Sequence, residues 1–168
     1  MIKKIDQKLF FVMYDFTVSH EFISKLAVFI TKFFPKFFSL IYFIVGGWLI
    51  YTGNFRLRAF ILIPAAVYLL VKSIPIFYNR RRPFAELVLQ NLVNQKEDHS
   101  FPSTHTASSM IISLVILNIS FELGILMIVL AFLTALSRIM VGVHYPTDIL
   151  GGWLIAMIFY FFGINILI

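Results

Sequence analysis

The chain has 168 residues, of which 60% are hydrophobic and 13% charged, and its net charge is +6. Soluble domains average roughly 45–50% apolar and about 25% charged residues. A soluble fold is therefore excluded, and the bilayer is the expected solvent of a single membrane domain over residues 1–168. The cations gather near the start of the chain and around the motifs below rather than on a solvated face, so we expect no nucleic-acid partner. The absence of cysteine excludes thiolate catalysis and disulfides.

The order of apolar and polar segments predicts an all-α integral membrane protein. Residues 1–18 mix Phe10 and Phe11 with Lys8 and Asp15, which is typical of an amphipathic helix in the membrane interface. Residues 20–168 then predict a bundle of six transmembrane helices, each needing about 20 residues. The first turn of this bundle is expected at Pro35. The six apolar runs are 22–34, 37–51, 59–77, 107–119, 123–140 and 149–168.

The longest polar stretch, residues 79–104, is the expected catalytic loop. Apolar residues recur in it at helical spacing, which predicts a short helix above the site; they are Phe84, Leu87, Val88 and Leu92. Its charges Glu86, Glu97 and Asp98 are expected to be solvated, and His99 to be interfacial. Six crossings would place both termini at one side of the membrane and the motifs at the other. The cations outside the motifs then favour a cytoplasmic location for both termini and a location outside the cytoplasm for the site.

The last polar segment, around residues 137–148, combines an imidazole with a carboxylate. Pro146 suits the first position of a helix, so His144 lies just before that helix and Asp148 in its first turn. A carboxylate on one ring nitrogen leaves the other nitrogen as a nucleophile or base. The alternative is that Asp148 only caps the helix, because acids favour that position.

The middle segment, residues 102–105, opens an apolar helix. Ser103 or Thr104 can cap it, and the free N–H groups of its first turn form a ready anion site. His105 lies in that turn and could protonate a leaving oxygen. Alone, the segment would be read as an exposed cap with an incidental histidine.

The first segment ends the third apolar run with Arg80, Arg81, Arg82 and Pro83. Three consecutive arginines cannot all face one ligand. Lys72 lies deeper in the same run, where a cation would be unusual without an anionic partner. Arginine pairs with phosphate in a bidentate, charge-assisted way, so the three segments together predict a phosphate site.

The three segments resemble the motifs of the type-2 phosphatidic acid phosphatase family of membrane lipid phosphatases, which read Lys-x6-Arg-Pro, Pro-Ser-Gly-His and Ser-Arg-x5-His-x3-Asp. The third motif is complete in Ser137, Arg138, His144 and Asp148. The second has Thr104 in place of glycine. The first keeps Arg82 and Pro83, but Pro75 stands at its lysine position. Lys72 and Arg80 are the candidates to replace that lysine.

The resemblance implies a catalytic role for three residues. His144 would form a phosphohistidine, Asp148 would orient it, and His105 would protonate the leaving group. The residues expected to bind the phosphate are Lys72, Arg80, Arg82, Ser103, Thr104 and Arg138. The family needs no metal or cofactor.

The implied substrate is a lipid phosphate or diphosphate in the inner membrane of a bacterium, with the site on the periplasmic or extracellular face. Undecaprenyl diphosphate ranks first, lipid A 1-phosphate second, and phosphatidylglycerophosphate or phosphatidate third. A transporter or channel is the main alternative outside enzymes, but the chain lacks the paired broken helices of many transporters. A zinc site of His105, His144 and Asp148 is disfavoured by the neighbouring cations.

Overall fold

The computed structural model describes residues 2–168 except 88, 91 and 97, so Val88 and Glu97 lie outside the described residues. The described residues form helices and no strand, which agrees with the predicted all-α class. The helices are α1 (Ile2–Val18), α2 (Glu21–Tyr51), α3 (Leu57–Phe77), α4 (Pro83–Glu86), α5 (Thr104–Leu117), α6 (Phe121–Met140) and α7 (Pro146–Leu167).

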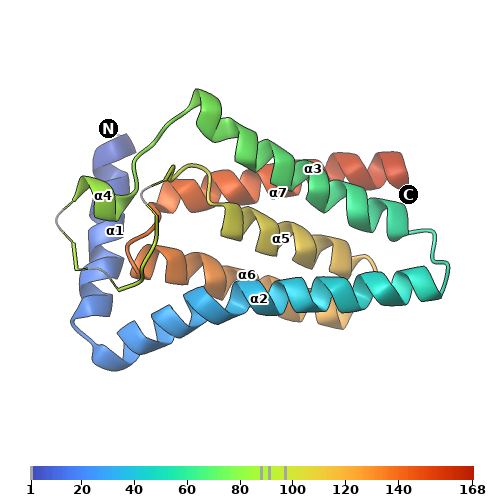
Figure 1. The fold of residues 1–168 in the computed structure, drawn as a ribbon, viewed down its shortest axis with the longest axis horizontal. Coiled ribbons are helices and arrows are strands. Elements are labelled where there is room, and N and C mark those ends of the chain that lie inside the picture. Colours follow the sequence, from blue (N-terminus) through green and yellow to red (C-terminus); the bar gives the residue numbers. More distant parts are fainter. Residues whose placement is uncertain (1, 88, 91, 97) are drawn as a thin grey trace.

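The five long helices α2, α3, α5, α6 and α7 form an elongated bundle, and α1 lies across one end of it (Figure 1). The helix α5 is central and packs against α2, α3, α6 and α7. Its Ile111 is buried with Val67 of α3, Met127 of α6 and Ala156 of α7 in one apolar core. The bundle is thus held together by apolar packing around the helix that carries His105.

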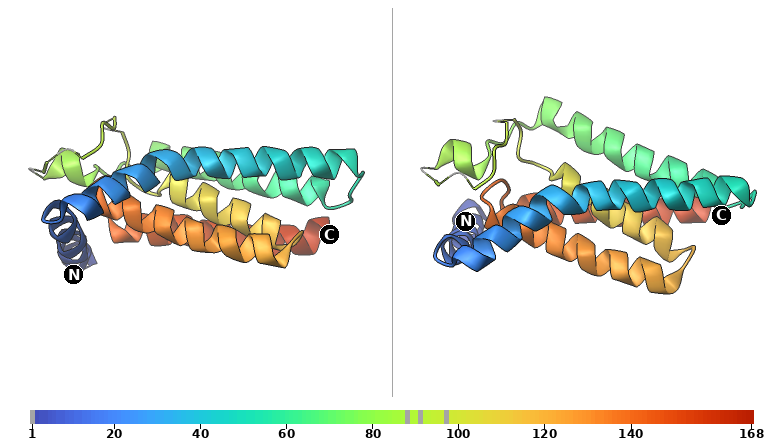
Figure 2. Two further views of the ribbon diagram at one scale, coloured as in Figure 1. Left: turned by 90° about the horizontal axis from the view of Figure 1, so that it is seen from below. Right: turned by 60° about the horizontal axis from the view of Figure 1, so that its bottom comes forward.

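The first two predicted membrane segments are one helix, so the prediction of six transmembrane helices is wrong. The helix α2 continues through Pro35 for 31 residues, and Figure 2 shows it as an unbroken, bent helix. A proline costs a helix one backbone hydrogen bond and bends it, and membrane helices tolerate this where neighbouring helices support the backbone. Thr31, one turn before Pro35, supplies such support: its hydroxyl donates to Ser137 Oγ of α6 at 2.8 Å.

Four of the described helices, α2, α3, α6 and α7, are long and apolar enough to cross a membrane. The apolar helix α5 has only 14 residues, about 21 Å at 1.5 Å per residue, which is less than the roughly 30 Å of a hydrocarbon core. It begins further into the bundle than α6 ends (Figure 1). The first turn of α5 lines a cavity together with residues of the loop after α3.

The prediction that both termini share the side opposite the site is also wrong. An odd number of long helices places the N-terminal helix and the C-terminus at opposite ends of the bundle (Figure 1). The N-terminal helix lies at the site's end, where Asp6 accepts a hydrogen bond from the backbone N–H of Thr147 at 3.0 Å. The N-terminal lysines therefore share an end with the motifs.

The predicted helix in the loop is a single turn, α4, that begins at Pro83. Leu87 ends it in an extended conformation, with φ −120° and ψ 151°. Beyond it, the described loop residues up to Ser103 form no further helix. Polar side chains of this stretch instead form hydrogen bonds with residues of the site.

Candidate active site

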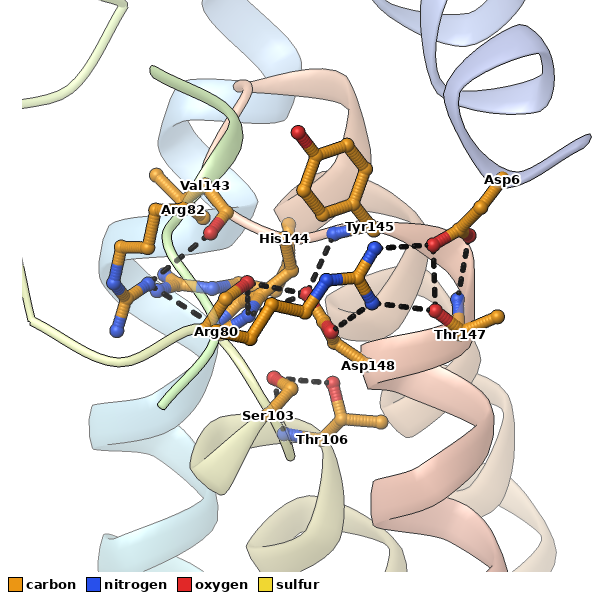
Figure 3. A network of polar contacts seen from close by, with 12 residues as sticks. Asp6, Arg80, Arg82, Ser103, Thr106, Val143, His144, Tyr145, Thr147 and Asp148 are labelled. Atoms are coloured by element: carbon orange, nitrogen blue, oxygen red, sulfur yellow. Dashed lines mark hydrogen bonds and ion pairs between the residues drawn. The ribbon is translucent and has the colours of Figure 1, made fainter. Parts of the chain in front are cut away.

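Three separate parts of the chain converge at the α1 end of the bundle: the segment after α3, the loop before α5, and the turn between α6 and α7 (Figure 3). The last turn depends on Gly142, whose φ of 83° is left-handed and strained for other residues. It folds back so that the N–H groups of Val143 and His144 donate to the carbonyl of Arg138, at 3.1 and 3.3 Å. This turn brings the arginine and the histidine of the third motif together.

Asp148 both caps α7 and contacts the imidazole of His144. Its Oδ2 accepts from the N–H of Tyr145 at 2.8 Å and lies 3.5 Å from Nδ1 of His144. The hydroxyl of Ser100 also donates to Oδ2. The two sequence interpretations of Asp148 are therefore compatible, because one buried carboxylate has both contacts.

The other ring nitrogen of His144 faces the cations. Nη1 of Arg82 lies 3.2 Å from Nε2. A guanidinium only donates hydrogen bonds, so this contact makes Nε2 an acceptor and leaves the ring proton on Nδ1, toward Asp148. Burial lowers the pKa of His144 to about 4; Asp148 opposes the shift, and Arg138 and Arg82 add to it. The imidazole is therefore neutral at pH 7.

His144 and His105 line one cavity of about 380 Å³. Lys72 and Arg82 line it from the α3 side, and Thr104 and His105 from the first turn of α5. The structure thus brings both imidazoles of the motifs to a single electropositive space. The other residues that line it are Tyr68, Val71, Pro75, Gln95, Asp98, His99 and Pro102.

Arg138 is a buried cation beside this cavity, with 2% of its surface exposed. Its Nη2 reaches Oε1 of Gln95 at only 3.5 Å, and its Nε has no hydrogen-bond partner among the described atoms. No carboxylate of the described residues lies within ion-pair distance of it. A buried charge normally requires a partner, so this guanidinium is suited to an anionic ligand.

Arg82 is also buried, and its Nε donates to Oδ1 of Asp98 at 2.6 Å. Its Nη1 donates to the carbonyl of Val143 at 3.2 Å. Asp98 was expected to be a solvated loop charge and His99 an interfacial side chain, yet both line the cavity. The Asp98 side chain is still 53% exposed. Because it also lies in a polar stretch of the chain, its contact with Arg82 could not be predicted.

Three of the expected phosphate-binding residues do not line the cavity: Arg138, which is buried beside it, and Ser103 and Arg80. Ser103 is the N-cap of α5: its Oγ accepts from the N–H of Thr106 at 3.4 Å and from the Thr106 hydroxyl at 2.9 Å. Its own N–H donates to the carbonyl of Asp148 at 3.1 Å, which ties α5 to α7. Arg80 lies on the far side of Asp148 and lines a separate cavity of about 820 Å³.

The described residues contain no group of three or more histidine, aspartate or glutamate side chains arranged to hold a metal ion. Of the three residues in the zinc alternative, Asp148 has both oxygens engaged. Oδ1 accepts from Arg80, and Oδ2 accepts from Ser100 and Tyr145.

The sequence model of the PAP2 superfamily matches residues 56–167. The chain belongs to the PAP2 superfamily. The undecaprenyl-diphosphatase BcrC of Bacillus subtilis (strain 168) is 30% identical over 158 residues, which cover 92% of this chain and 80% of that protein. The crystal structure of Aquifex aeolicus LpxE is similar with a TM-score of 0.77 and 27% identity, covering 95% of this chain and 94% of the other.

A second PAP2 superfamily structure, a phosphatidylglycerolphosphate phosphatase from Bacillus subtilis, also has a TM-score of 0.77. It is 20% identical and covers 98% of this chain and 85% of the other, so it supports the fold alone. The family resemblance drawn from the motifs is confirmed, as are the predictions of a membrane protein and of an enzyme of the lipid phosphatase kind.

Proposed function

We propose that this PAP2 protein hydrolyses a lipid diphosphate through a phosphohistidine intermediate on His144, without a metal ion. The observation that carries the proposal is the shared cavity. The imidazoles of His105, in the first turn of α5, and of His144, in the turn before α7, line it together with Lys72 and Arg82. Arg138 is buried beside it without a carboxylate partner among the described residues.

The first chemical step uses the lone pair of His144 Nε2, which the tautomer of the ring directs toward the cavity. Nε2 attacks the terminal phosphorus, the N–P bond forms, and the P–O bond to the lipid monophosphate breaks. His105, which takes up a proton when the phosphate anion binds beside it, donates that proton to the oxygen that leaves. In the second step His105 accepts a proton from water, the water oxygen attacks phosphorus, and inorganic phosphate departs from Nε2.

The cations stabilise the negative charge on the transferring phosphoryl oxygens, as metal ions do in other phosphatases. Arg82 and Arg138 are buried, so their interaction with an anion is only weakly screened by water. Lys72 would act as a point charge from the α3 side. Asp148 would hold the Nδ1 proton and stabilise the ring when it becomes positively charged.

A smaller neighbouring cavity supports a lipid as the substrate. Its volume is about 210 Å³, and it shares Tyr68, Thr104 and His105 with the phosphate cavity. It continues between α2, α3 and α5 to Phe38 and Ile112, which are residues of apolar helices. A phosphate headgroup could thus enter the site while its acyl or prenyl chain stays among these helices.

Undecaprenyl diphosphate is the proposed substrate, because the relative named undecaprenyl-diphosphatase aligns over most of both chains. The lipid A 1-phosphate group is the second candidate and phosphatidylglycerophosphate or phosphatidate the third. Cleavage of these monophosphates would release a lipid with a free hydroxyl group, whereas cleavage of undecaprenyl diphosphate would release a lipid monophosphate. The chemical identity of the released lipid therefore distinguishes the candidates.

The decisive experiment measures phosphate release by the purified protein in detergent from these lipids, with EDTA present. We expect the highest kcat/KM with undecaprenyl diphosphate. His144→Ala should be inactive, and Asp148→Asn should keep the fold and lose most turnover. Acid-labile but base-stable radioactive phosphate on the wild-type protein would report the phosphohistidine. Complete loss of activity with EDTA, restored by a metal ion, would contradict the metal-free mechanism.

We also propose that the site faces the outside of a bacterial inner membrane. Arg56 and Arg58 lie at the end of the bundle opposite the site and favour the cytoplasm for that end. Arg80, Arg82 and Lys3, at the site end, pair with carboxylates. Because the chain has no cysteine, single cysteines at Lys96 and Phe55 can be tested with a membrane-impermeant maleimide. Labelling of Lys96→Cys but not Phe55→Cys in intact cells is expected; the reverse would place the site inside.

A further inference from the structure

Asp6 of α1 is a buried carboxylate on a helix that the family motifs do not include. Only 3% of its surface is exposed. Its Oδ2 pairs with Nη2 of Arg80 at 2.5 Å and accepts from the Thr147 hydroxyl at 2.6 Å. Its Oδ1 accepts from the N–H of Thr147 at 3.0 Å, in the first turn of α7 (Figure 3).

Arg80 connects Asp6 to the site. Its Nη1 donates to Oδ1 of Asp148 at 2.7 Å, and its guanidinium lies 4.2 Å from the ring centroid of Tyr145. Burial alone would lower the pKa of Arg80, but Asp148 and Asp6 outweigh burial and raise it. The guanidinium thus bridges two buried carboxylates, one from α1 and one that touches His144.

A second, weaker link joins α1 to the same turn. Lys3 pairs with Glu86 at 2.7 Å, and the Tyr145 hydroxyl donates to the other oxygen of Glu86 at 2.9 Å. The Lys3 side chain is 69% exposed, and exposed ion pairs contribute little. The energetic link between α1 and the site is therefore expected to run through Asp6.

We propose that Asp6 and Arg80 are positioning residues for the reaction at His144, an inference that rests on the proposed function. The two carboxylates and the guanidinium together carry one net negative charge on the Nδ1 side of the imidazole. When Nε2 bonds to phosphorus, the ring keeps its Nδ1 proton and becomes positively charged. The cluster stabilises that cation. Without the Asp6 charge, Arg80 and Asp148 would form a neutral pair, and the stabilisation would be weaker.

A purely structural role predicts different results. Asp6 also caps the first turn of α7 through Thr147, and loss of a cap lowers stability. It would reduce the melting temperature or the active fraction, but it would leave the kcat of the remaining active protein, its KM and its pH profile unchanged. Measurements that separate these quantities therefore decide between the two roles.

The test compares Asp6→Asn with Asp15→Asn, the same substitution at an exposed position of the same helix. We expect Asp6→Asn to lower kcat per active site by about tenfold, since a lost buried charge interaction is of this order, while KM changes by less than about twofold. The acid limb of kcat/KM should move to lower pH, because removing a negative charge disfavours the protonated imidazole. Asp6→Glu should restore most of kcat, and Asp15→Asn should match wild type.

Arg80→Lys provides a second test, since a lysine cannot bridge the two carboxylates with a planar fork. It should also lower kcat with little change in KM. A wild-type kcat in folded Asp6→Asn or in Arg80→Lys would overturn the inference, as would a loss of kcat without a shift of the acid limb. If folded wild-type protein releases no phosphate from any lipid, the proposed function fails instead.

Discussion

Nη1 of Arg82 lies 3.2 Å from Nε2 of His144, the nitrogen that we propose attacks phosphorus. The same guanidinium donates from Nε to Asp98 and from Nη1 to the carbonyl of Val143. Arg82 therefore holds the proposed nucleophile, the turn after α6 and a loop carboxylate in one arrangement. An arriving phosphate would take over the donors that now serve Asp98 and His144.

Arg82→Lys should lower kcat/KM by about 100-fold, comparable to the loss of one preorganised donor in other active sites. A lysine keeps the positive charge but loses the fork that reaches three acceptors. Phosphate release in detergent measures the effect. The control is Arg81→Lys at the exposed neighbouring position; equal losses in the two variants would contradict a specific role for Arg82.

Asp98→Asn should strengthen the binding of phosphate analogues. The Asp98 carboxylate competes with the substrate for Nε of Arg82 and repels an anion in the same cavity. We expect the inhibition constant for orthovanadate to fall by about fivefold, which corresponds to roughly 1 kcal/mol. Weaker inhibition would instead show that Asp98 holds Arg82 in its binding geometry.

The pKa of His144 predicts activity well into the acidic range. In the proposed mechanism the neutral ring is the nucleophile, and its pKa is lowered to about 4 by burial and by the cations. As pH falls through that value the ring becomes protonated and the rate drops. The acid limb of kcat/KM should therefore lie near pH 4 rather than near 6.5, at the same position for monophosphate and diphosphate substrates. An acid limb near pH 6.5, at the same position for both kinds of substrate, would contradict this prediction.

Lys72→Gln should raise KM more than it lowers kcat, with a loss of about tenfold in kcat/KM. Lys72 lines the phosphate cavity, whereas Arg80 lies behind Asp148. The matched control is Lys36→Gln, an exposed lysine of α2. A wild-type KM in Lys72→Gln would mean that this cation does not contact the headgroup.

Gly124→Ala should destabilise the bundle. A Cβ at this position would lie 2.3 Å from Cα of Leu117, where α5 and α6 meet, and backbone must move to relieve the overlap. Such overpacking costs typically about 1–3 kcal/mol. A Cβ at Gly47 of α2 would meet no atom within 4 Å, so Gly47→Ala should keep or raise the melting temperature. Thermal unfolding in detergent checks both variants.

The motifs could be placed at helix ends from the sequence, because each combines ionisable side chains with the boundary of an apolar run. The spacing of His144 and Asp148 put both beside the start of one helix, and the contact between them follows from that geometry. The family could be identified on the same residues. These inferences depend on the spacing of residues that are close in the chain, and this spacing can be read directly from the sequence.

The course of α2 could not be predicted in the same way. A proline between two short apolar runs is equally compatible with a turn and with a bent helix, and the choice depends on support from α6, such as the bond between Thr31 and Ser137. Asp6 and Ser100 were missed for a related reason. Their contacts with Arg80 and Asp148 join segments far apart in the chain, and short polar side chains beside apolar runs resemble solvated ones.

The placement of α1 across the catalytic end has a practical consequence for handling the protein. A purification tag or fluorescent reporter fused before Met1 would crowd the helix that supplies Asp6 and Lys3, and would disturb turnover even in a well-folded preparation. A fusion after Ile168 would sit at the opposite end of the molecule, far from the chemistry.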